Sequence, residues 1–213
     1  MHRLTDLVQG LHEDRRAIVA IDGPDAAGKT MLAGALARQM TRPAVCVPVD
    51  AWHHPREFRL RQGPSSPEGY YLDSFDYDAL LRECVIPFTS GADRIRTARF
   101  DYRADVEVLS EHEVAPDAIL ILDGVFLLRP ALRRHWDLSV YLHVPESVTL
   151  DRAMRRDLSL FGSEAMVRER YDHRYLPGQA LYRAEAEPLD NADVVLDNSD
   201  PTDPVVLRWP DRE

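Results

Sequence analysis

The sequence predicts an α/β domain of three layers, in which helices cover both faces of a mostly parallel central sheet. Two observations carry this prediction. Short runs that are apolar on both faces, as in buried parallel strands, alternate along the chain with stretches of helical periodicity. A glycine-rich turn also joins the first such run, at residues 17–21, directly to the first long helix. The 213 residues suffice for one sizeable core, so we expect a single domain spanning residues 1–213.

The glycine-rich turn has the pattern G-x-x-x-x-G-K-T of a phosphate-binding P-loop, between a strand and a helix. The motif and the helical residue after it comprise Gly23, Pro24, Asp25, Ala26, Ala27, Gly28, Lys29, Thr30 and Met31. We expect their backbone N–H groups and the positive end of the helix to surround a polyphosphate. Lys29 would reach the β- and γ-phosphates, and Thr30 would bind Mg²⁺. A turn without function is the alternative, and the flanking strand and helix favour the P-loop.

The composition argues against several classes of protein. The chain has 26 Lys and Arg against 36 Asp and Glu, and its net charge of −10 disfavours general binding of nucleic acid or anionic membrane. Two cysteines, Cys46 and Cys84, are too few for a disulfide framework and predict reduced thiols. No apolar run approaches the length of a membrane span, and the N-terminus leads into no apolar signal region. We therefore expect a cytoplasmic protein.

The first part of the chain predicts two strands, each preceded by a helix. Apolar residues at 4, 7, 8 and 11 have the spacing of a helix that lies on a core. Pro48 predicts that the second strand lies at an edge of the sheet or ends there. The expected elements are a helix over 4–12, a strand over 17–21, a helix over about 29–40 and a strand over 44–49.

The middle of the chain breaks the alternation. Residues 51–74 read as an irregular segment that is longer than structural loops tend to be, so we expect it to be functional. The elements expected after it are a helix over 76–88, two β segments over 94–102 and 106–114 joined by a short turn, and a buried strand over 118–124.

The last part of the chain returns to alternating helices and strands. The expected elements are a short helix over 127–136, a strand over 138–144, helices over 145–158 and 163–175, a partly helical segment over 177–188 and a last strand over 192–197. The tail, 199–213, contains three prolines and is expected to be loose at its end. The core would then span about residues 17–198.

Three expected strands end in a carboxylate, at Asp22, Asp50 and Asp123. Ligands of open parallel sheets bind beyond the carboxyl ends of the strands. Asp123 follows four apolar residues, the Walker-B arrangement, and would hold Mg²⁺ with Thr30; capping of the turn before Gly124 is the alternative. Asp50 ends the strand beside the P-loop and is our candidate for the base that accepts a hydroxyl proton, with a turn cap as the alternative.

An arginine cluster occupies one side of the helix expected over 145–158. Arg152, Arg155 and Arg156 have i, i+3, i+4 spacing, and guanidinium groups bind phosphate oxygens in bidentate fashion. The cluster could therefore cover a nucleotide. A solvated face with local pairs such as Asp151–Arg155 is the alternative.

Histidines and aromatic residues are candidates for an acceptor pocket. His53 and His54 are adjacent, followed by a proline, and have no zinc-ligand spacing, so we expect His53 to line a pocket rather than hold a metal. Aromatic residues could stack on a planar substrate, although core packing is the commoner role. They are Tyr70, Tyr71, Phe75, Tyr77, Phe100 and Tyr102.

With these residues in place, the chain resembles the uridine kinase family of P-loop small-molecule kinases, a group that includes phosphoribulokinase. The resemblance covers about residues 17–198. Its motifs are GPDAAGKT (23–30), the strand end at Val49 and Asp50, LDSFDYDALL (72–81), LDGVFLL (122–128), DLSVYLHVPESVTLDRAMRRD (137–157) and ADVVLDN (192–198).

The resemblance implies a P-loop fold with a five-stranded parallel sheet, a β-hairpin insertion near the acceptor and a helical lid. It also implies transfer of the ATP γ-phosphate to a primary hydroxyl with Mg²⁺. By motif match, Asp50 corresponds to the catalytic aspartate, Asp123 to the metal-linked acid, and Arg152 and Arg156 to lid arginines. We therefore expect Asp50, Lys29 and Arg156 to be catalytic, and Arg152 and Arg156 to bind the nucleotide.

The sequence departs from the family pattern at three places, two at the expected acceptor site and one in the lid. Tyr70 stands where the family has an acid for the ribose, and Asp105 where it has a base-recognising histidine. The hairpin reads Phe100-Asp101-Tyr102, and the lid has Leu160-Phe161-Gly162-Ser163 in place of Glu-Arg-Gly-Arg. Altered hydrogen-bonding groups change substrate discrimination strongly. The acceptor-binding residues we expect are Asp50, His53, Tyr70, Phe100, Tyr102 and Asp105.

We thus expect an ATP- and Mg²⁺-dependent kinase that acts on a hydroxyl of a small, nucleoside-like metabolite. A kinase of a sugar, a pantothenate-like alcohol or a secondary metabolite is the first alternative. A nucleotide-binding module without efficient transfer is the second. The absence of an Asn-Lys-x-Asp motif disfavours a GTPase. Self-association into a homo-oligomer stays open.

Overall fold

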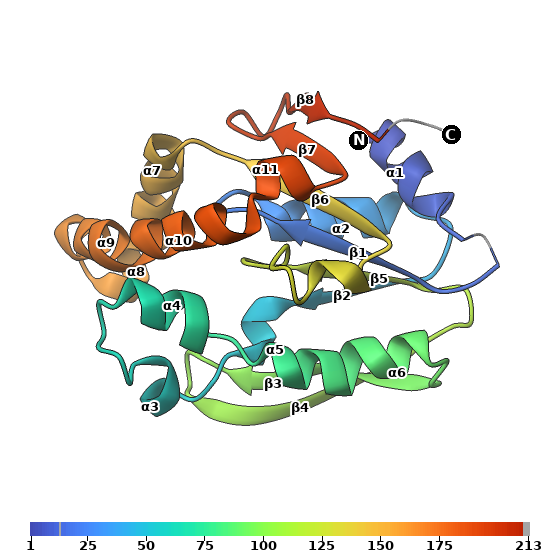
Figure 1. Ribbon diagram of the computed structural model, residues 1–213, viewed down its shortest axis with the longest axis horizontal. Helices are drawn as coiled ribbons and strands as arrows, with labels where there is room; N and C mark the ends of the chain where they lie inside the picture. Colours follow the sequence, from blue (N-terminus) through green and yellow to red (C-terminus); the bar gives the residue numbers. More distant parts are fainter. Residues whose placement is uncertain (13, 211–213) are drawn as a thin grey trace.

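The computed structural model describes residues 1–12 and 14–210, and its centre is a six-stranded sheet (Figure 1). The strand order is β2-β5-β1-β6-β7-β8, with the first five parallel and β8 antiparallel to β7. The strands are β1 (Ala17–Asp22), β2 (Ala44–Pro48), β5 (Ile119–Asp123), β6 (Leu138–His143), β7 (Val194–Asp197) and β8 (Val205–Arg208). The predicted mixed α/β fold with a mostly parallel sheet is confirmed, and β2, with Pro48, is an edge strand.

Side chains of the central strands are buried on both faces of the sheet. In β1, Ile18 and Ala20 belong to one hydrophobic cluster, whereas Val19 and Ile21 belong to the other. Successive side chains of a strand point to opposite faces, so an apolar run on a strand builds two cores at once. This explains why the strands were recognisable as continuous apolar runs.

Helices cover both faces, as the sequence predicted. On one face, α1 (His2–Gln9) and α2 (Lys29–Gln39) pack through buried residues such as Leu4 and Leu36. The other face is covered by α4 (Pro67–Asp73), by α10 (Leu176–Ala186) and by a continuous helical stretch with a π-helical segment. That stretch comprises α5 (Tyr77–Leu80), η2 (Leu81–Val85) and α6 (Ile86–Thr89).

The remaining helices are short or lie at the periphery. They are η1 (Val49–Trp52), α3 (Arg56–Arg59), η3 (Arg133–His135), α7 (Glu146–Arg156), α8 (Leu158–Phe161), α9 (Glu164–Arg170), η4 (Tyr171–Tyr175) and α11 (Pro188–Asn191). Figure 1 shows α7, α8 and α9 grouped at one end of the molecule, beside α10. No helix in the described part of the chain is both long and apolar enough to span a bilayer.

The expected hairpin is present as β3 (Arg94–Asp101) and β4 (Val106–Glu113), an antiparallel pair outside the main sheet. One face of β3 contacts η1 and η2, while β4 is largely exposed. The hairpin therefore brings its turn, around Tyr102 and Asp105, to the side of the segment that follows β2.

Three segments differ from the sequence prediction. Residues 51–74 contain helices α3 and α4; Ser66 caps α4 by accepting from the Gly69 N–H at 2.9 Å. Residues 127–136 form turns and only the short η3, because Leu127 and Leu128 make tertiary hydrogen bonds instead of helical ones. The tail forms β8, which covers the free edge of β7.

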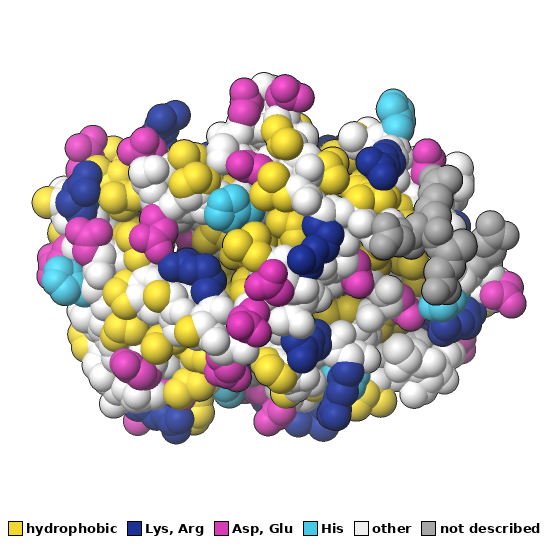
Figure 2. All heavy atoms as spheres, turned by 45° about the horizontal axis from the view of Figure 1, so that its top comes forward, with side chains coloured by type: hydrophobic (Ala, Val, Ile, Leu, Met, Phe, Trp, Pro, Cys, Tyr) yellow, Lys and Arg dark blue, Asp and Glu magenta, His cyan; other side chains and the backbone are white. Residues whose placement is uncertain are grey.

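The surface carries both signs of charge. On the face shown in Figure 2, acidic, basic and hydrophobic side chains are interspersed over the surface. On this face the acidic side chains are therefore not concentrated in one patch.

Candidate active site

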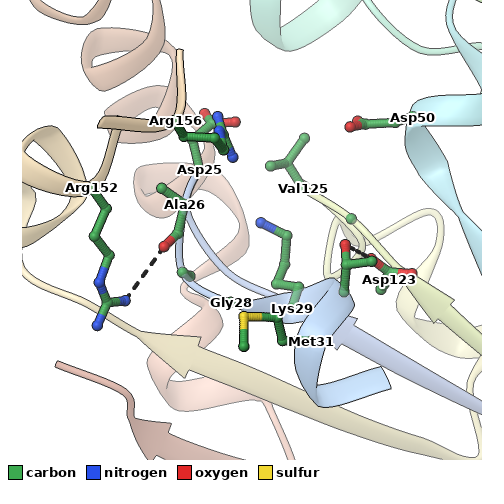
Figure 3. A pocket seen from close by; sticks show the side chains of 13 residues that line it. Asp25, Ala26, Gly28, Lys29, Met31, Asp50, Asp123, Val125, Arg152 and Arg156 are labelled. Carbon is green, nitrogen blue, oxygen red and sulfur yellow. Dashed lines mark hydrogen bonds between the residues drawn. The ribbon is translucent and has the colours of Figure 1, made fainter. Parts of the chain in front are cut away.

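A cavity of about 310 Å³ lies at the carboxyl edge of the parallel strands, around the predicted P-loop (Figure 3). Side chains from β5, η1 and α7 complete its walls. Its lining residues are Asp25, Ala26, Ala27, Gly28, Lys29, Thr30, Met31, Asp50, Asp123, Gly124, Val125, Arg152 and Arg156. We call it the donor cavity. Eleven of the expected site residues thus meet in one place, whereas Gly23 and Pro24 are not part of the lining.

Two glycines shape the P-loop because a side chain would not fit at either position. Gly28 has a φ of +95°, and a Cβ there would lie 2.9 Å from Nδ2 of Asn198. A Cβ on Gly23 would lie 2.6 Å from the carbonyl oxygen of Leu142. The Asn198 amide also donates to the Ala27 carbonyl at 2.7 Å, so the end of β7 supports the loop. No sequence motif assigned this role to Asn198.

Lys29 begins α2 and directs its ammonium group into the donor cavity (Figure 3). Its Nζ donates to the carbonyl oxygens of Gly23 at 3.0 Å and Pro24 at 2.7 Å. Burial lowers the pKa of Lys29, while the nearby carboxylates, Asp25 first, partly oppose that shift. A partly desolvated cation surrounded by loop backbone is suited to an anionic ligand.

Thr30 and Asp123 form a hydroxyl–carboxylate pair beside the loop. The Thr30 hydroxyl donates to Oδ2 of Asp123 at 2.5 Å. Burial raises the pKa of Asp123, and the Thr30 hydrogen bond and the Lys29 charge oppose this. In the described residues no group of three His, Cys, Asp or Glu side chains could hold a metal by itself. The pair nevertheless fits Mg²⁺, which takes few protein ligands when phosphates supply others.

Asp22 has a structural position that the sequence did not predict. Its carboxylate is fully buried and accepts from the N–H of Gly23 at 2.7 Å, from Leu128 at 3.3 Å and from the Tyr182 hydroxyl. Burial raises the pKa of Asp22, and these hydrogen bonds oppose the shift. Asp22 thus ties the start of the loop to α10 and does not line the donor cavity.

Asp50 lies across the donor cavity from the loop, at the start of η1 (Figure 3). Its position depends on close packing between strand ends, because a Cβ on Gly124 would lie 2.4 Å from Cβ of Val49. Within residues 1–12 and 14–210, no hydrogen bond to the Asp50 carboxylate is found, and the side chain is exposed to the cavity. It is therefore free to accept a proton from a ligand.

The three arginines of the α7 cluster have different surroundings. Arg152 donates to the carbonyl oxygens of Ala26 at 3.4 Å and Asn198 at 2.8 Å, so it rests on the P-loop. Arg156 pairs with Asp157, with Nε–Oδ1 at 2.7 Å, and lines the cavity. Hydrogen bonding to Asp157 raises the pKa of Arg156. Arg155 is exposed and lines no part of the cavity, in agreement with the solvated alternative.

A second cavity, of about 410 Å³, lies between the hairpin turn, the segment after β2 and helices α8, α9 and η4. Its lining residues are His53, Arg56, Arg59, Leu60, Tyr70, Ser74, Tyr102, Arg103, Asp105, Leu160, Phe161, Arg170, Arg174 and Tyr175. We call it the acceptor cavity. A chamber of about 170 Å³ shares Asp25, Asp50 and Arg156 with the donor cavity, and His53 and Tyr70 with the acceptor cavity. The chamber therefore connects the two.

Four of the expected acceptor-binding residues line the acceptor cavity, but several make internal contacts. The His53 ring stacks on Tyr102 with centroids 4.5 Å apart, and its Nδ1 lies 2.8 Å from the Asp50 carbonyl oxygen. Burial lowers the pKa of His53, which favours the neutral ring. The Tyr70 hydroxyl donates to Asp25 at 2.7 Å. Phe100 is buried and lines none of the three cavities, so its expected contact with the acceptor is not seen.

Asp105 turns inward at the hairpin rather than standing free. Its Oδ1 accepts from the backbone N–H of Arg56 at 2.8 Å and pairs with Arg59 at 3.3 Å.

The residues of the acceptor cavity that the sequence did not predict are mostly basic. Arg59 and Arg103 come from α3 and the hairpin turn, whereas Arg170 and Arg174 lie four residues apart on the helical stretch of α9 and η4, a spacing that could have indicated them.

The sheet order and the turn after β1 place the chain among the P-loop nucleotide-binding proteins. Ligand positions in such sheets lie beyond the carboxyl ends of the strands, where both cavities are found.

Comparison with known proteins narrows this class. No protein-family profile matches the chain. It is 28% identical over 149 residues to a uridine kinase of Latilactobacillus sakei, covering 68% of each chain. It is 25% identical over 167 residues to a uridine kinase of Proteus mirabilis, covering 75% of this chain and 78% of the relative. A solved structure described as a possible uridine kinase from Bacillus stearothermophilus superposes with a TM-score of 0.73 at 21% identity, over 91% of this chain and 95% of that one. These similarities support a P-loop kinase of the uridine kinase-like type, and thus a phosphotransferase.

Proposed function

We propose that this kinase transfers the γ-phosphate of ATP, with Mg²⁺, to a hydroxyl of a small metabolite. One observation carries the proposal. Lys29, the Thr30–Asp123 pair and Asp50 line the same cavity, and a chamber leads from Asp50 to a second cavity large enough for a small acceptor. Phosphoryl transfer depends mainly on positioning and electrostatic stabilisation, which these groups are suited to provide.

The donor cavity fits a triphosphate. The backbone N–H groups of the loop and the Lys29 ammonium would bind phosphate oxygens, and Arg152 and Arg156 would cover the phosphates from α7. Thr30 and Asp123 would hold Mg²⁺. When bound, the ion neutralises phosphate charge.

Asp50 would act on the acceptor side. As the acceptor oxygen attacks the γ-phosphorus, its proton passes to the Asp50 carboxylate, and the bond from phosphorus to the ADP oxygen breaks. A carboxylate with no internal hydrogen bond can take this proton without first losing a partner.

The relatives' name, uridine kinase, favours a nucleoside acceptor. Two contacts favour a non-nucleoside alcohol as the second candidate. The Tyr70 hydroxyl is engaged by Asp25, and Asp105 is engaged by Arg56 and Arg59. Each residue therefore already has an internal partner with which a ribose or a base would compete. A binding module without transfer is less well supported, because Asp50 faces the donor cavity.

The variant Asp50→Asn tests the proposal. General-base catalysis contributes about 10²- to 10⁴-fold, so we expect kcat to fall by that range while nucleotide affinity stays within about twofold. Acceptor-dependent ADP release and equilibrium nucleotide binding measure the two quantities. Asp78→Asn is the matched control, because Asp78 is exposed on α5 and lines neither cavity. Unchanged turnover in Asp50→Asn would remove Asp50 from this role.

A further inference from the structure

The acceptor cavity is strongly basic in a protein whose net charge is −10. A single carboxylate, Asp105, lines it, and burial lowers the pKa of His53 so that this ring adds little positive charge at neutral pH. Five guanidinium groups line the same space, from Arg56, Arg59, Arg103, Arg170 and Arg174. The local charge balance is thus opposite to that of the whole chain.

Apart from the pair of Arg59 with Asp105, residues 1–12 and 14–210 supply no ion-pair partner for these five arginines. Arg174 is only 4% exposed, and its hydrogen bonds run to backbone carbonyl oxygens, such as that of Ser66 at 3.1 Å, and to the Ser74 hydroxyl. Arg170 donates to the Pro64 carbonyl at 2.6 Å. Carbonyl dipoles orient a cation but leave its net charge in place. A desolvated cation that has no counter-ion among the described residues favours the binding of an anion.

Arg59 pairs with an acidic side chain and also has a hydrogen-bond donor that is not used. Its pair with Asp105 has N and O atoms 3.3 Å apart, and its Nε is buried with no hydrogen-bond partner in the described residues. Burial lowers the pKa of Arg174; Tyr175 and Tyr70 oppose this shift, whereas the charges of Arg170 and Arg59 add to it. The guanidinium groups of these three arginines therefore share one region of positive potential.

The rest of the acceptor cavity suits a short ligand body. Aromatic and aliphatic side chains, including Tyr102, Phe161 and Leu160, line it, and the chamber leads from it to Asp50. A ligand with a hydroxyl at one end and an anion at the other would satisfy both ends of this space. Arginine binds carboxylate and phosphate oxygens in the same bidentate geometry.

We infer that the acceptor of this kinase is a hydroxylated metabolite that carries an oxyanion, a phosphate ester or a carboxylate, bound by Arg59, Arg170 and Arg174. The inference rests on the proposed function, because it takes the second cavity to be the acceptor site. The oxyanion holds the far end of the ligand, and the hydroxyl extends through the chamber toward Asp50.

Binding with the donor cavity filled tests this inference without requiring turnover. The protein is saturated with Mg²⁺ and a non-hydrolysable ATP analogue, so added anions do not bind the P-loop. Calorimetric titrations then compare two pairs of probes, ribose 5-phosphate with ribose and glycerate with glycerol. We expect the charged member of at least one pair to bind at least about tenfold more tightly. The pair that shows the preference distinguishes a phosphate from a carboxylate.

Arginine variants locate the bound anion. Arg170→Gln and Arg59→Gln should each weaken the charged probe about 10- to 100-fold and leave the neutral probe within about twofold. Arg133→Gln is the control, because Arg133 is exposed on η3 and lines neither cavity. Equal affinity within both pairs, no binding of either charged probe at millimolar concentration, or a preference that survives both variants would overturn the inference.

A separate assay distinguishes failure of the proposed function. Acceptor-dependent ADP release is measured with neutral and charged alcohols. Anion binding that is lost in Arg170→Gln, together with no ADP release from any alcohol, would retain the anion site and refute the kinase assignment of the cavity. Efficient turnover of neutral alcohols without any preference for charge would retain the proposed function and refute the anionic acceptor.

Discussion

The donor and acceptor cavities are built from different parts of the polypeptide. The donor cavity is formed largely by the backbone of one turn, which Asn198 supports through a carbonyl of that turn. The acceptor cavity is formed by side chains from η1, α3, the hairpin turn, α8 and η4, segments that are far apart in the sequence. Backbone N–H groups are present whatever the side chains are, whereas a pocket made by side chains changes with each substitution. The donor chemistry can therefore persist while the acceptor differs among relatives.

The largest difference we expect between the cavities concerns pH. Burial lowers the pKa of Lys29, so its ammonium loses the proton at a lower pH than an exposed lysine does. Nucleotide affinity should be full below that pKa and fall about 10- to 100-fold as the pH rises through it, because a charged hydrogen-bond donor is lost. Affinity of the acceptor cavity for a charged probe should not fall, since arginine keeps its proton.

Nucleotide binding measured between pH 7 and pH 10 or so, without acceptor, checks this expectation. Lys29→Met is the reference variant, with weak affinity that does not vary over the same range. A parallel loss of affinity in both cavities would contradict the distinction between a lysine site and an arginine site.

The next effect concerns the backbone of the P-loop. Gly28 has a φ of +95°, and an alanine there would place its Cβ 2.9 Å from Asn198. A left-handed conformation costs an ordinary residue about 1–2 kcal/mol, so Gly28→Ala should weaken nucleotide binding about tenfold and leave binding of the charged acceptor probe unchanged. Gly91→Ala is the matched control: Gly91 has a φ of +82° with no atom near its added Cβ, and it lies outside both cavities.

Both glycine variants should lose stability, which thermal unfolding measures, and Gly28→Ala should lose more because its Cβ also approaches Asn198. Only Gly28→Ala should lose nucleotide affinity. Equal loss of affinity in the two variants would mean that backbone strain acts globally and not on the loop.

The smallest effect concerns the link between the cavities. The Tyr70 hydroxyl, at the acceptor side, donates to Asp25 of the P-loop at 2.7 Å. Tyr70→Phe should reduce the free energy of unfolding by about 1 kcal/mol and change each single-ligand affinity by no more than a few-fold. Any effect of one ligand on the affinity for the other should be reduced in this variant. Tyr71→Phe is the control, because its hydroxyl binds Glu185 outside both cavities.

Ligand titrations in the presence and absence of the second ligand measure this coupling. If the coupling is present and has the same size in Tyr70→Phe as in the parent, the two cavities communicate through another contact. If neither protein shows coupling, the two cavities bind their ligands independently.

The sequence predicted the strands well because each signal was local. Residues 118–124 read as a buried strand, and β5 lies between β1 and β2 with every side chain buried. The segment 51–74, which the sequence predicts to be irregular, contains two helices. Pro67 is in fact the first residue of α4 and Ser66 its cap, a start signal that lies within the same pattern. Residues 127–136 had helical spacing, but Leu128 donates to Asp22 instead.

The donor site could be predicted because its pattern is contiguous. Eight consecutive residues specify the turn, and strand order then brings Asp123 and Asp50 to the same edge. The acceptor site could not be predicted in this way. Arg59 and Arg174 are 115 residues apart in the sequence. Only the folded chain brings them together, and the Arg174 guanidinium group donates to the Arg59 carbonyl oxygen at 3.3 Å. Asp105 and Tyr70 were read as free ligand contacts, whereas each has an internal partner.

The close approach of Gly124 to Val49 has a consequence for protein engineering. The ends of β2 and β5 meet where a single methyl group would not fit, so Asp50 and Asp123 are held on one rigid unit. Directed evolution toward a new alcohol would gain little from changes at that junction. Mutational libraries are better confined to the cavity-lining residues of α3 and of the helical segment 170–175, which lie outside that junction.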